Sequence, residues 1–115
     1  MNKNREFRDY ITNDILSHLD SIKTKSMFGG YGIYWHDVFI AIIADNELYT
    51  KVNKDLKEKY KALGYYPFTY QQKNKLVELN YINVPLETIE NPNAIRKRLE
   101  ESYLIAIQKT GKKLA

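Results

Sequence analysis

With 115 residues, 43% of them hydrophobic, the chain is long enough for one compact domain around a single core and too short for two. The absence of cysteine excludes disulfides, thiolate chemistry and cysteine-bound metal, and no run approaches the roughly 20 apolar residues that cross a bilayer, so we expect a cytoplasmic protein with no membrane partner. The formal net charge of +4 is compatible with nucleic-acid binding, and equally with a solvated surface rich in lysine.

The first element that the pattern predicts is an amphipathic helix over residues 5–22. Its apolar residues recur at steps of four, four, four and three, as expected for one face of an α-helix: Phe7, Ile11, Ile15, Leu19 and Ile22. His18 lies beside this stripe, where a lone histidine is usually a boundary residue and not a ligand. The other histidine, His36, falls in a predicted turn.

Residues 26–34 combine glycine with aromatic side chains. Three of the five glycines of the chain lie within four positions here, among apolar and aromatic neighbours: Met27, Phe28, Gly29, Gly30, Tyr31, Gly32 and Tyr34. Glycine permits a positive φ or the close approach of another backbone, and the flanking residues are typical of extended chain. We therefore predict a strand that carries a glycine bulge or kink.

Two further strands are predicted before residue 53, which makes a three-stranded meander. The first strand ends at the turn pair His36-Asp37, residues 38–44 form the central strand, and residues 48–52 form the third. The central strand is apolar throughout. Alternation would place Phe39, Ala41 and Ile43 on one face and Val38, Ile40, Ile42 and Ala44 on the other.

This lack of alternation predicts an uncovered sheet face. In an antiparallel sheet with helices on one face, the other face normally meets water and is polar. The neighbouring strand also has bulk on both faces, with Tyr31, Ile33 and Trp35 opposite Tyr34. We expect a homodimer that buries the second face, and the alternative is that one helix crosses over and completes the monomer.

A second helix is predicted after Asn53, which can cap its N-terminus. Leu56, Tyr60 and Leu63 supply its apolar positions, and Gly64 supplies its C-terminal stop. Residues 51–61 contain five lysines against two acidic residues. A phosphate-binding ridge on this helix would use Lys54, Lys57 and Lys61, whereas the alternative is an ordinary solvated helix face.

Residues 65–70 contain four aromatic side chains and lead into a second hairpin, whose return strand covers residues 75–82. Aromatic rings interleaved with lysines can stack the bases of single-stranded nucleic acid. The alternative is packing within the hairpin, with Phe68 and Tyr70 against Val77 and Leu79.

The last helix is predicted to begin at Asn91-Pro92, with Asn91 as its N-cap and Pro92 in its first turn. Its buried stripe is Ile95, Leu99, Tyr103 and Ala106 or Ile107, and Gly111 and Lys112-Lys113 follow its end. The order of elements is therefore α-β-β-β-α-β-β-α. We predict an α+β domain of two layers, an antiparallel five-stranded sheet with helices on one face.

Several stretches, in order and across nearly the whole chain, resemble the N-terminal domain of the TfoX (Sxy) family of bacterial competence regulators. They lie at 27–34, 41–45, 48–52, 67–70 and 81–85, and the residues that carry the resemblance are Met27, Phe28, Gly29, Gly30, Tyr31, Gly32, Pro67, Phe68, Tyr70, Tyr81 and Pro85. The resemblance implies a fold like that of the secretion chaperones, a role in transcription of competence genes and no catalytic residues. Full-length members add a helical C-terminal domain, so we expect residues 1–115 to be a stand-alone N-terminal domain.

No arrangement of residues predicts catalysis. The sequence has no metal-ligand spacing such as His-Glu-x-x-His, and Gly29-Gly30-x-Gly32 lacks the lysine of a phosphate loop and leads into a strand. We therefore expect a non-enzymatic regulatory module, without metal or cofactor, whose partners are a regulatory protein and a second copy of itself. The alternative is a nucleic-acid-binding regulator that uses the basic, tyrosine-rich surface.

Overall fold

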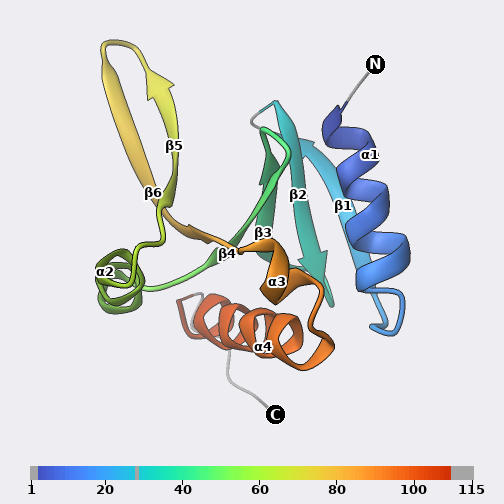
Figure 1. Cartoon of the computed structure of the whole chain (residues 1–115). Coiled ribbons are helices and arrows are strands. Elements are labelled where there is room, and N and C mark those ends of the chain that lie inside the picture. Colours follow the sequence, from blue (N-terminus) through green and yellow to red (C-terminus); the bar gives the residue numbers. More distant parts are fainter. Residues whose placement is uncertain (1–2, 28, 110–115) are drawn as a thin grey trace.

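Figure 1 shows the computed structural model of the chain, which describes residues 3–27 and 29–109. Its helices are α1 (Lys3–Asp9), the π-helix η1 (Tyr10–Ile15), α2 (Lys54–Ala62), α3 (Leu86–Ile89) and α4 (Pro92–Lys109). Its strands are β1 (Ile22–Met27), β2 (Gly30–Trp35), β3 (Val38–Ala44), β4 (Glu47–Lys51), β5 (Pro67–Gln72) and β6 (Lys75–Asn83).

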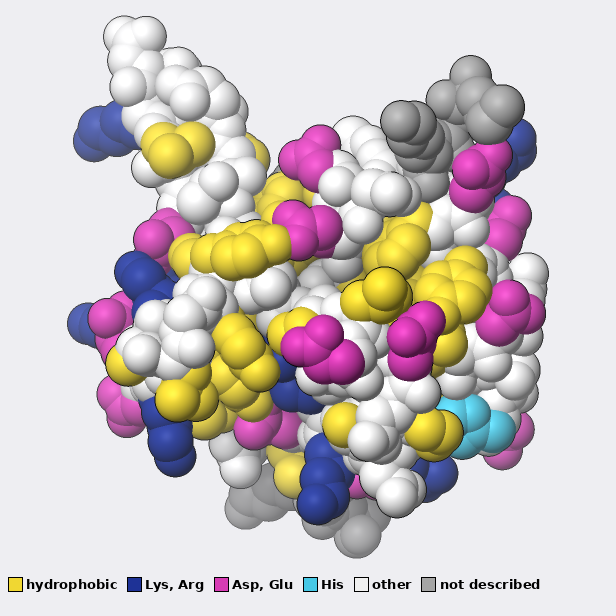
Figure 2. Space-filling model, viewed as in Figure 1, with side chains coloured by type: hydrophobic (Ala, Val, Ile, Leu, Met, Phe, Trp, Pro, Cys, Tyr) yellow, Lys and Arg dark blue, Asp and Glu magenta, His cyan; other side chains and the backbone are white. Residues whose placement is uncertain are grey.

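The strands form one open antiparallel sheet in the order β1-β2-β3-β4-β6-β5. Helix α1 packs against β2 and β3, and α4 packs against β3 and β4, on one face of the sheet. The outer part of the β5–β6 hairpin extends from the body of the molecule as an arm, which Figures 1 and 2 both show. The predicted α+β class and antiparallel sheet are thus confirmed, but the described chain has six strands and not five.

The sixth strand is β1, which the helical interpretation of residues 5–22 missed. The helical segment ends at Ile15, with a backbone hydrogen bond of 2.8 Å from Leu16 N to Ile11 O that closes a π-turn. Leu19 and Ile22 still pack on the core that Ile11 enters, but from a loop and a strand. The period-four apolar stripe therefore identified residues that do pack on the core, but the predicted helix is wrong beyond Ile15.

The glycine-rich stretch contains a turn between two strands, at Gly29, where the sequence predicted a bulge or kink within one strand. Gly29 has φ +74° in this turn, and Gly30 begins β2. Asn4 fixes the turn in space, because its Nδ2 donates to Gly29 O at 3.2 Å while its Oδ1 accepts from Asn46 N at 2.8 Å. The start of α1 is thereby tied to the β1–β2 and β3–β4 turns. Phe28 lies outside the described residues.

Strand β3 contains a bulge that corrects the predicted assignment of its faces. Ile33 pairs with Ala41 but Tyr34 pairs with Phe39, so Ile40 is an extra residue on β3. Beyond the bulge the alternation is reversed: Val38 packs with the helix-side core, whereas Phe39 packs on the opposite face. The prediction that Val38 shares a face with Ile42, and Phe39 with Ala41, is wrong for this reason.

Two separate cores result, one on each face of the sheet. The helix-side core includes Ile33, Ile43, Leu48, Ile95 and Leu99, each fully buried. The core of the other face, which we call the open face, consists of Ile42, Ala44, Tyr49, Phe68 and Tyr81, with Phe39, Tyr70 and Leu79 packed against it.

Both predicted helix caps are confirmed. Asn53 Oδ1 accepts from Leu56 N at 2.8 Å, and Asn91 Oδ1 accepts from Asn93 N and Ala94 N, each at 3.1 Å. Gly64 has the expected positive φ of +99°, but Leu63 is 69% exposed, because α2 ends at Ala62 and Leu63 lies beyond its last turn. The predicted apolar stripe of α2 is therefore wrong at Leu63.

The predicted stripe of α4 is confirmed by the burial of Ile95, Leu99, Ala106 and Ile107. One cation lies among them: Arg98, of which 7% is exposed, donates through Nη2 to Thr50 Oγ1, Ile82 O and Asn83 O at 2.8 to 3.1 Å. Its guanidinium carbon also lies 4.7 Å from the ring centroid of Tyr60 on α2 and 5.8 Å from that of Tyr65. Arg98 thus joins α4 to the sheet and to α2. The residues that follow Lys109, including Gly111 and Lys112-Lys113, lie outside the described part of the chain.

Candidate functional site

A row of aromatic rings crosses the open face of the sheet. The ring of Tyr34 on β2 stacks with that of Phe39 on β3 at 5.2 Å between centroids, and Phe39 lies 5.5 Å from Tyr81 on β6. Lysines end the row on both sides: Lys25 Nζ lies 5.7 Å from the Tyr34 centroid, and Lys51 Nζ lies 5.0 Å from the Tyr81 centroid. We call Tyr34, Phe39 and Tyr81 the aromatic row.

Gly32 and Met27 lie next to this row on the same face of the sheet, beside Phe39. A side chain at Gly32 would meet Met27 Sδ at 2.7 Å and Phe39 Cε1 at 3.0 Å, so the missing side chain makes the space that both residues fill. Met27 pairs with Gly30, which places it on the same face of the sheet as Gly32. The absence of a side chain at Gly32 therefore leaves room for Met27 and Phe39 to pack on the open face.

A second aromatic group continues the open face toward the arm. Tyr49 contacts Phe68 edge to face at 5.3 Å, and Phe68 stacks with Tyr70 at 6.5 Å. The Tyr49 hydroxyl donates to Glu47 at 3.0 Å, and Tyr66 donates to the same carboxylate. That hydrogen bond raises the pKa of Tyr66 to about 12, and burial raises the pKa of Tyr49 and Tyr81, so these hydroxyls stay neutral at physiological pH.

The orientation of the rings limits what the open face can bind. Tyr34 and Phe39 are 25° from parallel and stack on each other, and a lysine ammonium lies over Tyr34 and another over Tyr81. Base stacking needs free ring faces. Here each ring of the row lies next to another ring or a lysine ammonium, which leaves less ring face for a base to stack on.

Two of the three lysines of the predicted basic ridge of α2 form ion pairs with one acidic residue of β6. Lys57 Nζ and Lys61 Nζ lie 3.1 Å and 3.3 Å from Glu78 Oε1. The hydrogen bond from Lys57 is the main cause of a lowered pKa at Glu78. Lys54 is exposed at the start of the helix. Figure 2 shows acidic side chains interspersed with the basic ones around α2, so no continuous positive area forms on this face.

The remaining residues of the resemblance lie in different places. Tyr31 is on the helix side, where the guanidinium carbon of Arg8 lies 4.6 Å from its ring centroid. Pro67 begins β5, and Pro85 is the residue before α3. These residues do not meet in one site. Sequence reasoning placed Tyr34 on the face opposite Tyr31, Ile33 and Trp35, but it missed the row that Tyr34 forms with Phe39 and Tyr81.

The structure shows neither a metal centre nor a membrane span in the part of the chain that it describes. No group of three or more His, Asp or Glu side chains could hold an ion among residues 3–27 and 29–109. Within the same residues no helix is long and apolar enough to cross a bilayer.

Fold and site together define a small α+β domain that has helices on one sheet face and a row of aromatic side chains on the other. The chain belongs to the TfoX N-terminal domain family, whose model matches residues 14–106. It is 22% identical, over 89 residues, to the DNA transformation protein TfoX1 of Aliivibrio fischeri. That alignment covers 77% of this chain and 43% of the relative, so the chain spans less than half the length of the curated relative that it matches.

Proposed function

We propose that this chain is a competence-related regulatory protein that acts in the cytoplasm, without catalysis, through protein contacts made by its open sheet face. The observation that carries this proposal is the aromatic row on a face against which no described helix packs. Membership in the TfoX N-terminal domain family and the similarity to a DNA transformation protein support the competence role. Control of competence-gene transcription is the finer form of the same proposal.

The composition of the open face favours a protein partner. Tyrosine and phenylalanine are enriched where proteins meet, because they bury a large area with few rotatable bonds. Tyr34 and Phe39 are half-buried, so a partner could cover what remains exposed. Nucleic acid is the second candidate, favoured by Lys25 and Lys51, but the occupied ring faces and the paired ridge of α2 argue against it.

The partner class can be tested by capture from lysate of the bacterium that encodes the chain, with and without nuclease. The Tyr34→Ala variant should lose the captured protein, because it removes one end of the aromatic row. Tyr10→Ala is the matched control, since Tyr10 is also half-buried but lies in η1 and packs on the helix-side core. Partners that disappear on nuclease treatment would instead favour the nucleic-acid candidate.

The competence role has its own readout. Deletion of the gene should change transformation frequency and competence-gene transcript levels in the same host, and the Tyr34→Ala protein should fail to restore them. Unchanged transformation in the deletion strain would contradict the role while leaving the binding surface untested by that measurement.

We also propose that one protein that covers the open face is a second copy of the chain. The face carries apolar side chains from β2 through β6, and two-fold association is the commonest way to bury such a surface. Light scattering after size exclusion should give twice the 13.6 kDa monomer mass at micromolar concentration. A monomer mass that stays constant over a tenfold rise in concentration would refute the dimer.

A further inference from the structure

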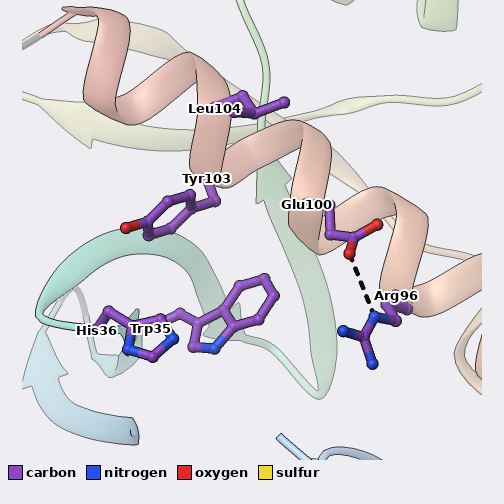
Figure 3. Close-up of a pocket in the computed structure, with 6 residues that line it drawn as sticks. All are labelled: Trp35, His36, Arg96, Glu100, Tyr103 and Leu104. Atoms are coloured by element: carbon purple, nitrogen blue, oxygen red, sulfur yellow. Dashed lines mark hydrogen bonds and ion pairs between the residues drawn. The ribbon is translucent and has the colours of Figure 1, made fainter. Parts of the chain in front are cut away.

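A pocket of about 500 Å³ lies on the helix side, away from the open face, where the β2–β3 turn meets α4. Figure 3 shows Trp35 and His36 on one side of it and Arg96 and Glu100 on the other, with Tyr103 beside the Trp35 ring. The ring centroids of Trp35 and Tyr103 are 5.6 Å apart at an interplanar angle of 62°, so the two rings form an angled apolar wall. Pockets of this volume accommodate small organic ligands.

The polar groups around this pocket include donors that have no acceptor among the described residues. Arg96 Nε donates to Glu100 Oε2 at 3.2 Å, which orients the guanidinium and leaves its terminal NH₂ groups without a partner among the described residues. The Tyr103 hydroxyl likewise has no partner there. The indole Nε1 of Trp35, a residue 9% exposed, is the one buried side-chain donor of the described chain that has no acceptor. A buried donor without an acceptor is rare and calls for a structural reason.

These features select the charge of the ligand. A guanidinium with a free fork prefers a carboxylate or a phosphate, which it binds through two parallel hydrogen bonds. The Glu100 carboxylate beside it would repel a doubly charged phosphate more strongly than a singly charged carboxylate. Trp35, Tyr103 and Leu104, which is 43% exposed, supply apolar surface for the rest of the molecule.

We propose that this pocket binds a small monocarboxylate with an apolar or aromatic body. The carboxylate bonds to the fork of Arg96, and the body lies along Trp35 and Tyr103. The site is separate from the open face, so the proposal stands independently of the proposed protein contacts. Binding against residues 96–104 of α4 would give the domain a site at which a small molecule regulates it.

The single tryptophan of the chain makes the test specific to this pocket. In ¹H–¹⁵N spectra Trp35 gives the only indole N–H signal. Titration with 3-phenylpropionate should shift that signal saturably. The neutral amide of the same acid, and inorganic phosphate, should bind with a dissociation constant at least about tenfold higher. Equal effects of the acid and its amide would overturn the proposal, and so would the absence of a saturable shift at millimolar acid.

Variants on α4 separate the pocket from general surface charge. Arg96→Gln should weaken 3-phenylpropionate binding about tenfold or more, because it removes the charged fork. Lys97→Gln removes the same charge from the next, exposed position of the helix, outside the pocket, and should bind as the parent does. Equal weakening in both variants would show that the acid responds only to net charge. The rest of the spectrum reports whether each variant is folded.

Discussion

The clearest test of the fold is a comparison of alanine substitutions at three glycines that differ in what a side chain would meet. A Cβ at Gly30 would lie 1.9 Å from Ile43 O and 2.9 Å from Ile43 C, so strands β2 and β3 would have to separate. A Cβ at Gly29 meets nothing within 4 Å, but this residue has φ +74°. A Cβ at Gly32 meets the end of the flexible Met27 side chain at 2.7 Å.

The expected costs follow in that order. Gly30→Ala should lower the free energy of unfolding by about 3 kcal/mol or more, because backbone atoms of a central strand must move. Gly29→Ala should cost about 1–2 kcal/mol of left-handed strain. Gly32→Ala should cost about 1 kcal/mol, because Met27 can change rotamer.

Urea denaturation followed by circular dichroism measures all three values at constant slope. Globular domains are typically stable by only about 5–15 kcal/mol, so a Gly30→Ala protein that fails to fold would also agree with the reasoning. Equal midpoints for Gly29→Ala and Gly30→Ala, or a Gly30→Ala cost below that of Gly32→Ala, would refute it.

Three further measurements test other parts of the structure. Arg98→Met should cost about 3 kcal/mol or more in urea, because it leaves buried acceptors unsatisfied, and Arg98→Lys should recover only part since it lacks the fork. Asn53→Ala should cost about 1 kcal/mol through loss of the α2 cap, and an unchanged midpoint would contradict the capping role. The pKa of Tyr66 is raised to about 12, and that of Tyr81 is also raised, so the native state keeps protons that the unfolded chain loses near pH 10. The stability that these two groups contribute is therefore present below about pH 10 and is lost as the pH rises through their native pKa values. The share of the tyrosinate absorbance that Tyr66 and Tyr81 contribute should therefore appear only well above pH 10 and together with unfolding, and Tyr66→Phe and Tyr81→Phe should each reduce that late part; its appearance near pH 10 in folded protein would contradict this.

Local chemistry made the caps, turns and hairpins predictable from the sequence. Asn53, Asn91 and Gly64 each act through their own backbone or nearest turn, so their roles do not depend on distant residues. The β2–β3 turn at His36 and Asp37, both at positive φ, was predictable for the same reason.

Features that depend on distant partners were not predictable. The start of β1 at Ile22 depends on its pairing with Trp35, and a period-four stripe cannot distinguish a helix from a loop and strand that enter the same core. The ion pairs of Lys57 and Lys61 depend on Glu78, which is distant in sequence. The donor-rich pocket likewise combines Trp35 with α4.

Two irregularities of the sheet converge on the open face. The extra residue Ile40 turns Phe39 away from the helix side, and the missing side chain at Gly32 provides the space into which Phe39 and Met27 pack. Ile40 itself is fully buried in the helix-side core, so the bulge serves both faces of the sheet. Because bulges that re-aim a side chain commonly lie next to functional surfaces, their joint effect on Phe39 supports the proposal that the domain binds a partner through its open face. The same reasoning predicts that Phe39→Ala will reduce partner capture more than Tyr10→Ala does, beyond any difference in stability between the two variants. If Phe39→Ala lowers only the stability and leaves partner capture unchanged, the aromatic row is a second core and not a binding surface.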